Sequence, residues 1–409
     1  MSGGASLESA VPAPEWMRRA RDGAALLFLA SMYFSIAVSS ISLGLMAAAL
    51  LVIMVKTRRW SLAGTPLDYF FLAYVAVEMI STVFSVNPAQ SLLFSRRLLL
   101  IGIAYFFAST ITERKCLGRS VGVLLGAATV AAVAGCGFMM FHGSDQPFRL
   151  GLFTFYMTAS GQMMVAALML LPFIVHRSSP ARVRWLAALA MAPVLVCLYG
   201  TVTRGAYLAF LVGALVVVII RNKWLLIPLA LLLLLIVFFS PPYIESRIQS
   251  IVDPNHPENV TRISMWVAGI RIFSDHPWVG VGDIDLGDLM REHADPGYLG
   301  LWGHLHNVPL QILVTLGVLG FVVVLALFLK IAVTEWRIYR SVKEDWLLGS
   351  CTLGVFAAFI GIQVQGLTEW NFGDQEIALL LWTGLGFALA IGRWMPGPTH
   401  PETAPAEGA

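Results

Sequence analysis

Residues 308–329 read VPLQILVTLGVLGFVVVLALFL and contain no charged side chain, and this run decides the fold class. An apolar run of about 20 residues has the length that a helix needs to cross the hydrocarbon core of a bilayer. Similar runs recur along the 409-residue chain, in which 58% of the residues are hydrophobic and only 12% are charged. Soluble domains carry about 25% charged residues. The sequence therefore predicts an all-α integral membrane protein.

The apolar runs predict about twelve transmembrane helices. The expected organisation is a bundle of nine spans over residues 1–240, a helical loop over residues 241–303 and three further spans over residues 304–394. A tail rich in Pro, Ala and Glu, residues 395–409, is expected to be disordered. The runs show no internal repeat, which counts against a transporter built from repeated halves. The twelve runs begin near Ala24, Ile41, Leu67, Leu98, Val121, Leu152, Trp185, Gly205, Trp224, Asn307, Trp346 and Ile377.

The distribution of basic residues predicts the orientation of these spans. If the N-terminus is cytoplasmic, most of the 27 Lys and Arg residues fall in cytoplasmic loops, as the positive-inside rule requires. We therefore expect a multi-pass protein with both termini in the cytoplasm and the long loop on the outer side. The basic residues left on the outer side are all arginines: Arg96, Arg97, Arg149, Arg204, Arg247, Arg262, Arg271 and Arg291.

The long outer loop is expected to form amphipathic helices. Apolar residues recur at helical spacing near its start and again after Asn259, which is the expected N-cap of the second helix. Such helices lie either on the membrane surface or over a cavity. The alternative is that the loop is only a lid and takes no part in a reaction. The two apolar stripes are Ile244, Ile248, Ile251 and Val252, and then Ile263, Trp266, Val267, Ile270 and Phe273.

All the basic residues predicted on the outer side are arginines and none is a lysine. This choice favours bidentate binding of an anion such as phosphate. Arg204 stands out because its segment, TVTRGAY at residues 201–207, has no acidic residue close in sequence. Arg97 opens the fourth span in a similar way. Glu78 falls inside the third span and is expected to pair with Arg96 or Arg97, since an unpaired carboxylate is costly in a membrane. For any single arginine, snorkelling or pairing with an acid is the alternative.

Two histidines in GHLHN, residues 303–307, lead into the tenth span. A histidine in the first turn of a helix feels the positive end of the helix dipole, which disfavours its protonation, and a neutral imidazole can act as a general base. His304 and His306 are two residues apart, so on a helix they would face different directions and would not form a metal site. Taken alone, either residue is more often a structural hydrogen-bonding group than a base.

Asp283 and Asp285 allow two interpretations. An Asp-X-Asp pair can bind a divalent metal together with a nucleotide sugar, but nucleotide sugars are cytoplasmic and this pair is predicted outside. Acids that follow the Gly-Val-Gly turn at residues 280–282 also suit the start of a short helix, which is the favoured interpretation. The chain contains no Walker, zinc-helix or nucleophile-elbow motif, so no metal and no cofactor is expected. The net charge of +3 is too small to indicate a nucleic-acid partner.

Several of these elements together resemble the O-antigen ligase superfamily. His306-Asn307 followed by Gly-Val-Leu-Gly at residues 317–320 is similar to the signature of that family. The resemblance extends over residues 201–320. Its other elements are Arg204-Gly205, the helix that carries Arg262 and Trp266, and PWVGVG at residues 277–282.

The resemblance implies a GT-C-like membrane fold and a metal-independent, inverting glycosyltransferase on the periplasmic face of the bacterial inner membrane. Its donor would be a glycan on undecaprenyl diphosphate, its acceptor a sugar hydroxyl of lipid A–core, and membrane lipids would surround it. His306 would be the general base. The diphosphate would be bound by Arg204, Arg262 and Arg97, and the supporting residues would be His304, Asn307, Glu78 and Trp266.

Three other functions stay open from the sequence. An O-antigen polymerase would use a lipid-linked glycan as acceptor as well, and a protein O-oligosaccharyltransferase would use a polypeptide. A transporter for an anion or a lipid-linked glycan belongs to a different class, and in it the outer arginines would form a selectivity ring. Transporters of this kind carry broken helices or titratable residues at the bilayer midplane, for which Glu78 alone gives little support.

Overall fold

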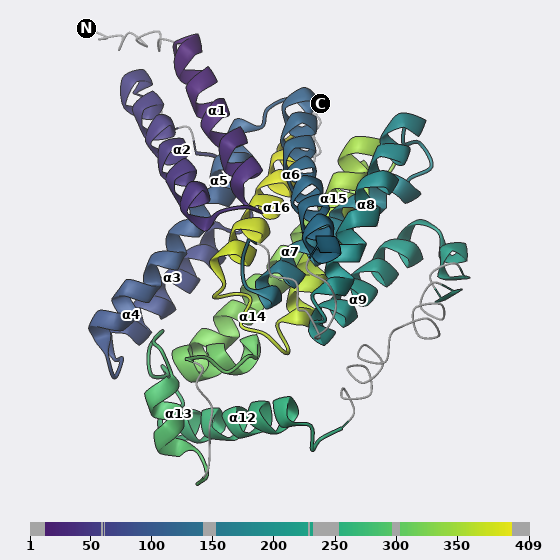
Figure 1. The fold of residues 1–409 in the computed structure, drawn as a ribbon. Coiled ribbons are helices and arrows are strands. Elements are labelled where there is room, and N and C mark those ends of the chain that lie inside the picture. The colour runs from purple at the N-terminus through teal and green to yellow at the C-terminus, as the bar shows by residue number, and fades with distance from the viewer. Residues whose placement is uncertain are drawn as a thin grey trace, which may run out of the picture.

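The computed structural model describes residues 13–58, 60, 62–141, 153–227, 230–231, 253–296 and 303–394. Over these residues the regular structure is entirely helical, which confirms the predicted all-α class (Figure 1). Nine stretches of helix in the described part of the chain are long and apolar enough to cross a membrane. They are α2 (Ile36–Thr57), the stretch Pro88–Thr110, α6 (Arg114–Phe141), α7 (Tyr156–Val175), α8 (Ala181–Gly200), α9 (Arg204–Arg221), α14 (Val308–Val342), α15 (Trp346–Gln365) and α16 (Gln375–Arg393).

Two further predicted spans coincide with shorter helices. Helices α1 (Glu15–Ser31) and α3 (Asp68–Val83) have 17 and 16 residues, fewer than the roughly 20 that a helix needs to cross the hydrocarbon core of a bilayer. Most of the run expected to begin near Trp224 lies outside the described residues, as do the first apolar stripe of the outer loop and the tail at residues 395–409. The total of twelve spans and the GT-C-like arrangement therefore stay predictions.

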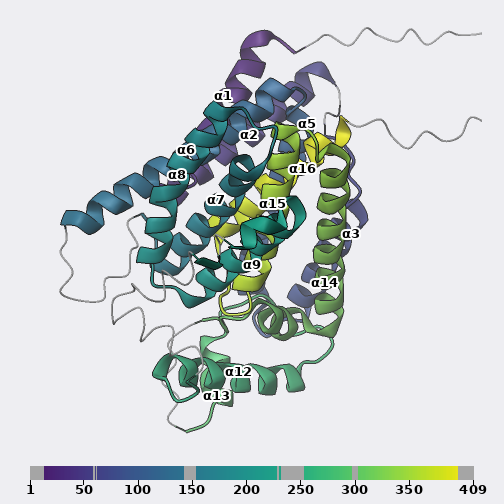
Figure 2. The same ribbon diagram turned by 90° about the vertical axis from the view of Figure 1, so that its right-hand side faces the viewer.

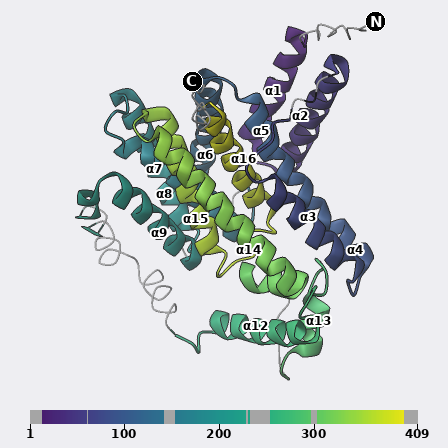
Figure 3. The same cartoon turned by 180° about the vertical axis from the view of Figure 1, so that it is seen from behind.

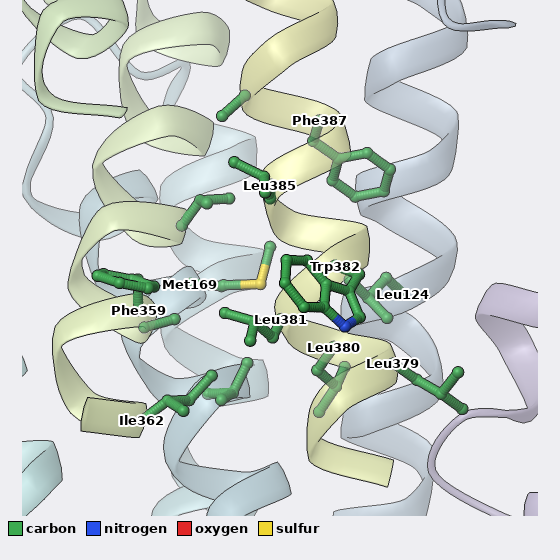
Figure 4. Close-up of a cluster of buried hydrophobic side chains, with 14 of the residues drawn as sticks. Leu124, Met169, Phe359, Ile362, Leu379, Leu380, Leu381, Trp382, Leu385 and Phe387 are labelled. Atoms are coloured by element: carbon green, nitrogen blue, oxygen red, sulfur yellow. The ribbon is translucent and has the colours of Figure 1, made fainter. Parts of the chain in front are cut away.

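Helices α7, α15 and α16 form the centre of the bundle. In their most apolar stretches, 78%, 72% and 83% of the residues are buried. In α2 the corresponding share is 28%, so α2 is peripheral. Figure 4 shows the contact between these central helices, with Met169 of α7, Phe359 of α15 and Trp382 of α16 in one apolar cluster. Because α15 and α16 are central, the loop that joins them, residues 366–374, is held on both sides by rigid helices.

Helix α14 changes direction at Gly317, as Figure 3 shows. Gly317 has φ 65°, and a Cβ atom there would lie 2.3 Å from the backbone carbon of Trp278. Gly280, with φ 70°, would clash in the same way with the backbone of Thr315. The backbone N–H groups of Val281 and Val318 donate across this contact, to Val314 and Pro277 respectively. The motifs PWVGVG at residues 277–282 and GVLG at residues 317–320 thus contact each other through their backbones.

Helices α12 (Pro257–Asp275) and α13 (Gly287–His293) form a layer across one end of the bundle, which we call the cap layer (Figures 1 and 2). The predicted second amphipathic helix is therefore present as α12. Its buried residues are Met265, Ala268, Gly269 and Ile272.

Ile263 and Ile270 of the predicted apolar stripe are 45% and 54% exposed, as the prediction of a helix on the membrane surface allows. One detail predicted for α12 is wrong. Asn259 is not the N-cap, because the helix begins at Pro257 and its N-cap is His256. A proline at the first helical position costs no backbone hydrogen bond, which explains the earlier start.

The opposite end of the bundle gathers the loops predicted to be cytoplasmic. Arg114 at the start of α6 forms an ion pair with Asp345 at the start of α15. Arg221 at the end of α9 donates to the carbonyl oxygen of Lys343 at 2.8 Å, and Arg393 at the end of α16 donates to Ala108. The basic loops therefore share one end of the molecule, and the cap layer covers the other.

Candidate active site

The loop between α15 and α16 joins the predicted site residues at the cap-layer end. Glu369 in this loop accepts from both sides, at 2.9 Å from Nδ1 of His306 and at 2.6 Å from a guanidinium nitrogen of Arg262. Trp370 lies beside Arg97, whose Cζ is 5.4 Å from the centre of the indole ring. The structure thus brings together His306, Arg262 and Arg97, although they come from three separate parts of the chain.

His306 does not lie in the first turn of a helix, which corrects the prediction. Asn307 is the N-cap of α14, because its side-chain oxygen accepts from the N–H of Leu310 at 2.9 Å. His306 therefore precedes the helix, and its φ of 48° places it in the left-handed region. Strained backbone of this kind in a non-glycine residue typically costs about 1–3 kcal/mol and clusters at functional sites.

Neighbouring side chains fix the strained segment. The indole N–H of Trp266 on α12 donates to the carbonyl oxygen of Leu305 at 2.9 Å, and the N–H of Leu305 donates to Gln311. The side chain of Asn307 also donates to the carbonyl oxygen of Leu367, in the loop that carries Glu369. These contacts hold His306 at a fixed position relative to Glu369.

The contact with Glu369 determines the tautomer of His306. An ionised carboxylate only accepts hydrogen bonds, so in the neutral imidazole of His306 the proton lies on Nδ1 and the lone pair on Nε2. Arg262 orients Glu369 from its other oxygen. A base held by a carboxylate, which is in turn held by a cation, is the arrangement that activates a hydroxyl nucleophile.

His304 lies beside His306, contrary to the expectation that the two would point apart. Their ring centres are 4.3 Å apart, which is possible because this segment is not helical. Burial, reinforced by His306, lowers the pKa of His304 to about 4. His304 is therefore neutral at neutral pH.

Arg97 is surrounded by two acids. Its guanidinium lies 3.1 Å from Asp283 and 3.6 Å from Glu78, both buried. The predicted pairing of Glu78 with an arginine across the short loop is therefore present, through Arg97. Asp283 takes part in the same cluster, and Asp285 accepts from the N–H of Gly287 at the start of α13. Both aspartates were predicted to lie at the start of a short helix, and of the two only Asp285 does so.

Arg204 opens α9 and contacts the cap layer. Its guanidinium donates to Asn259 at 2.9 Å and lies 3.4 Å from Glu258, so an acid distant in sequence accompanies it. Val202, two residues earlier, has φ 51°, which is strained for a β-branched residue. Gly205 approaches Thr368 so closely that a Cβ would lie 2.3 Å from its hydroxyl oxygen. Arg204 therefore lies next to the same loop that holds Glu369.

Two cavities meet at His304 and Trp370. The larger, of about 550 Å³, is lined by Arg96, Arg97 and Asp283 among others. The smaller, of about 410 Å³, is lined by His306 and Glu369 among others. Neither lining includes Arg204 or Arg262 among the described residues. Within the same residues, no group of three or more His, Cys, Asp or Glu side chains is placed to hold a metal ion.

Glu369 and Trp370 are the site residues that sequence reasoning left without a role. Their segment, GLTEWNFG at residues 366–373, interrupts two long apolar runs with a charged and an aromatic side chain. In a chain with so few charges, such a short polar interruption is a usable signal. It did not show which histidine or arginine Glu369 would contact.

Comparison with known proteins supports the assignment made from the motifs. No curated protein matches the chain. A family model does match, over residues 189–325. This segment holds Arg204, Arg262, His304 and His306, while Arg97 and Glu369 lie outside it. The match is to the Wzy_C family, described as O-antigen ligase, and it confirms the family resemblance predicted from the sequence.

Proposed function

We propose that this protein is an O-antigen ligase, which moves a glycan from undecaprenyl diphosphate to a sugar hydroxyl of lipid A–core at the periplasmic face of the inner membrane. The family match supports an O-antigen ligase or polymerase type of function in general. The observation that carries the finer proposal is the His306–Glu369–Arg262 chain, beside two adjoining cavities at one end of a helical bundle.

In the proposed reaction the acceptor hydroxyl attacks the anomeric carbon of the donor. His306 takes the hydroxyl proton on Nε2 as the new C–O bond forms and the bond from the anomeric carbon to the diphosphate oxygen breaks. A positioned general base contributes on the order of 10²–10⁴ to the rate. Glu369 keeps His306 in the required tautomer and stabilises the imidazolium that forms. A single displacement of this kind inverts the anomeric carbon.

The leaving diphosphate gains negative charge, so cations fixed in advance should stabilise the transition state most. Arg97 and its neighbour Arg96 line the larger cavity, and we propose that they bind the diphosphate there. Arg204 and Arg262 were predicted for the same task. For these two residues the role stays a prediction, since neither of them is among the described residues that line the two cavities.

The competing functions differ in the catalytic groups that they require at this site. A polymerase or a protein oligosaccharyltransferase needs the same base and cations and differs only in the acceptor. Proton-coupled transporters also use chains of carboxylates and histidines, but they carry them inside their spans. Here His306 precedes α14 and lies beside two cavities at one end of the bundle, which favours an enzyme. The ligase is distinguished from its relatives by the products formed in cells.

The test is a deletion strain carrying either the wild-type gene, His306→Ala or, as a matched control, His276→Ala. His276 is an exposed histidine at the end of α12. We expect the deletion and His306→Ala to lose O-antigen from lipopolysaccharide on a gel while lipid-linked polymer accumulates, and His276→Ala to behave as wild type. Core capped with a single repeat would indicate a polymerase, and normal lipopolysaccharide with His306→Ala would remove this residue as the base.

A further inference from the structure

The two cavities differ in charge. The larger one is lined by the guanidinium groups of Arg96 and Arg97 together with the carboxyl groups of Asp283 and Asp285, so its cations and acids are equal in number. The smaller one has no Lys or Arg among its described lining residues, and instead has carboxylates, amides and aromatic rings. A diphosphate group would meet cations in the first cavity and repulsion from the carboxylates in the second. The smaller cavity is therefore suited to a ligand that is rich in hydroxyl groups and carries no phosphate.

A buried amide in the smaller cavity has an unused hydrogen-bonding atom. Gln365 is 1% exposed and lines this cavity. Its amide nitrogen donates to Ser160 at 3.3 Å, but its Oε1 has no hydrogen-bond partner among the described atoms. A buried polar atom without a partner costs free energy unless a ligand or water satisfies it. This oxygen is itself buried and lies next to Gly161 of α7, and a water or ligand hydroxyl that reaches it from the cavity would be a suitable donor.

Two carboxylates that also line this cavity are held in fixed positions. Thr158 of α7 donates to Asp374 at 2.5 Å, and Thr154 donates to Glu376 at 3.2 Å. Burial and the neighbouring Glu376 raise the pKa of Asp374 above its ordinary value. Asp374 also caps α16, since it accepts from the N–H of Glu376. Carboxylates fixed in this way accept hydrogen bonds from sugar hydroxyls without a cost for ordering their side chains.

Aromatic rings complete the lining of the smaller cavity. Phe155 and Trp370 both face it, and Trp370 also borders the larger cavity. Apolar ring faces pack against the C–H faces of a sugar, while carboxylates and amides take its hydroxyls. This combination of side chains distinguishes a sugar ring from a lipid tail, which would leave the polar groups unpaired.

We propose that the smaller cavity is the binding site for the acceptor sugar, with Asp374 and Gln365 as residues that bind its hydroxyl groups. This assignment rests on the proposed function. It places the attacking hydroxyl beside His306 in the smaller cavity and the departing diphosphate beside Arg97 in the larger cavity. His304 and Trp370, which line both cavities, lie between the two groups. The anomeric carbon then lies between them, as a direct displacement requires.

The experiment measures transfer by purified protein in proteoliposomes, with lipid A–core and lipid-linked glycan from the same cells as substrates. The variant is Asp374→Asn, which keeps a capping oxygen for α16. Its matched control is Asp345→Asn, since Asp345 caps α15 at the opposite end of the bundle. We expect Asp374→Asn to raise the KM for lipid A–core by about 10–100-fold, the effect of losing a hydrogen bond to a charged group, and to leave the KM for the donor within about twofold.

Thr158→Val provides a second variant, because it removes the hydroxyl that holds Asp374 and nearly preserves the shape of the side chain. It should raise the KM for lipid A–core in the same direction by a smaller factor. A rise in the KM for the donor with either variant, or no change for either substrate, overturns the acceptor-site assignment. Absence of transfer by the wild type with both substrates present contradicts the proposed function instead, so the two failures are distinguishable.

Discussion

Each arginine predicted to bind phosphate has a carboxylate partner in this structure. Arg97 lies 3.1 Å from Asp283, Arg204 lies 3.4 Å from Glu258, and Arg262 lies 2.6 Å from Glu369. Such pairing keeps the guanidinium groups ordered and reduces the cost of holding them near the apolar end of a bundle. In the proposed reaction, the diphosphate would compete with these acids for the guanidinium groups. Replacing an acid partner should therefore also change the affinity for the donor.

Glu369→Gln tests the role of Glu369 as a positioning residue. The glutamine amide can donate to Nδ1 of His306, which would move the imidazole proton to Nε2 and remove the base. It also loses the ion pair with Arg262. We expect kcat to fall on the order of 10²–10⁴ and both KM values to change little. Steady-state kinetics in proteoliposomes provide the measurement.

Two comparisons separate this role from a general loss of stability. Glu369→Asp keeps the carboxylate and should recover part of the activity, and the pH dependence of kcat in this variant should follow that of the wild type. Glu292→Gln, an exposed acid on α13, should have no effect. If Glu369→Gln melted at a much lower temperature and Glu369→Asp recovered nothing, a purely structural role would explain the result.

The sequence led us to propose His306 and three arginines as site residues, because they lie beside recognisable motifs or stand out at the ends of apolar runs, and their roles stay predictions. It did not allow their partners to be predicted. Glu369 is 63 positions from His306 in the chain, and only the antiparallel course of α14, α15 and α16 brings the two together. The close pair of His304 and His306 was missed because a helix was assumed, whereas His306 adopts left-handed backbone before the helix begins.

At the scale of single elements, α12 has apolar residues on more than one face. Ile263 and Ile270 of the predicted stripe are exposed, whereas Met265 and Ile272 are buried together with the small residues Ala268 and Gly269. The small residues contribute little hydropathy but allow close approach, and a Cβ at Gly269 would lie 2.9 Å from the side chain of Leu305. Helical periodicity predicted the helix, but the face that packs on the segment carrying His306 also depends on these small residues.

The contact between Gly317 and Gly280 makes a prediction about α14. Gly317→Ala would force alanine into a backbone conformation, φ 65° and ψ −172°, that is essentially restricted to glycine and costs about 1–3 kcal/mol. It would also force a methyl group into the backbone of Trp278. We expect a loss of at least about 2 kcal/mol in stability, seen as a lower melting temperature in detergent. Reduced activity should accompany it, since the displaced segment leads to Asp283 and thus to Arg97.

Gly126→Ala in α6 is the matched control for this substitution. Gly126 is helical, and nothing lies within 4 Å of a Cβ built there. Alanine should therefore be neutral or stabilise the protein by up to about 1 kcal/mol. Equal melting temperatures for the two variants would show that the backbone contact at Gly317 contributes little.

At the scale of the whole molecule, the two ends of the bundle have different compositions. One end gathers the basic loops, with Arg114, Arg221 and Arg393 bonded to neighbouring segments. The other end holds the cap layer, the two cavities and His306 (Figure 1). The positive-inside rule predicted this division from the sequence. The number of spans was less predictable, because α1 and α3 are too short to meet the criterion for a span by themselves.

Labelling of single cysteines tests which end faces the periplasm. In a variant without the four native cysteines, Asp288→Cys places a thiol on α13 and Glu344→Cys places one in the turn between α14 and α15. Both native side chains are highly exposed, at 86% and 87%, so differences in reactivity reflect sidedness. In cells with a permeable outer membrane, an impermeant maleimide should label residue 288 and should label residue 344 only after the inner membrane is disrupted. The reverse pattern would put His306 on the cytoplasmic side of the membrane. The proposed donor and acceptor meet at the periplasmic side, so this result would contradict the proposed ligase reaction.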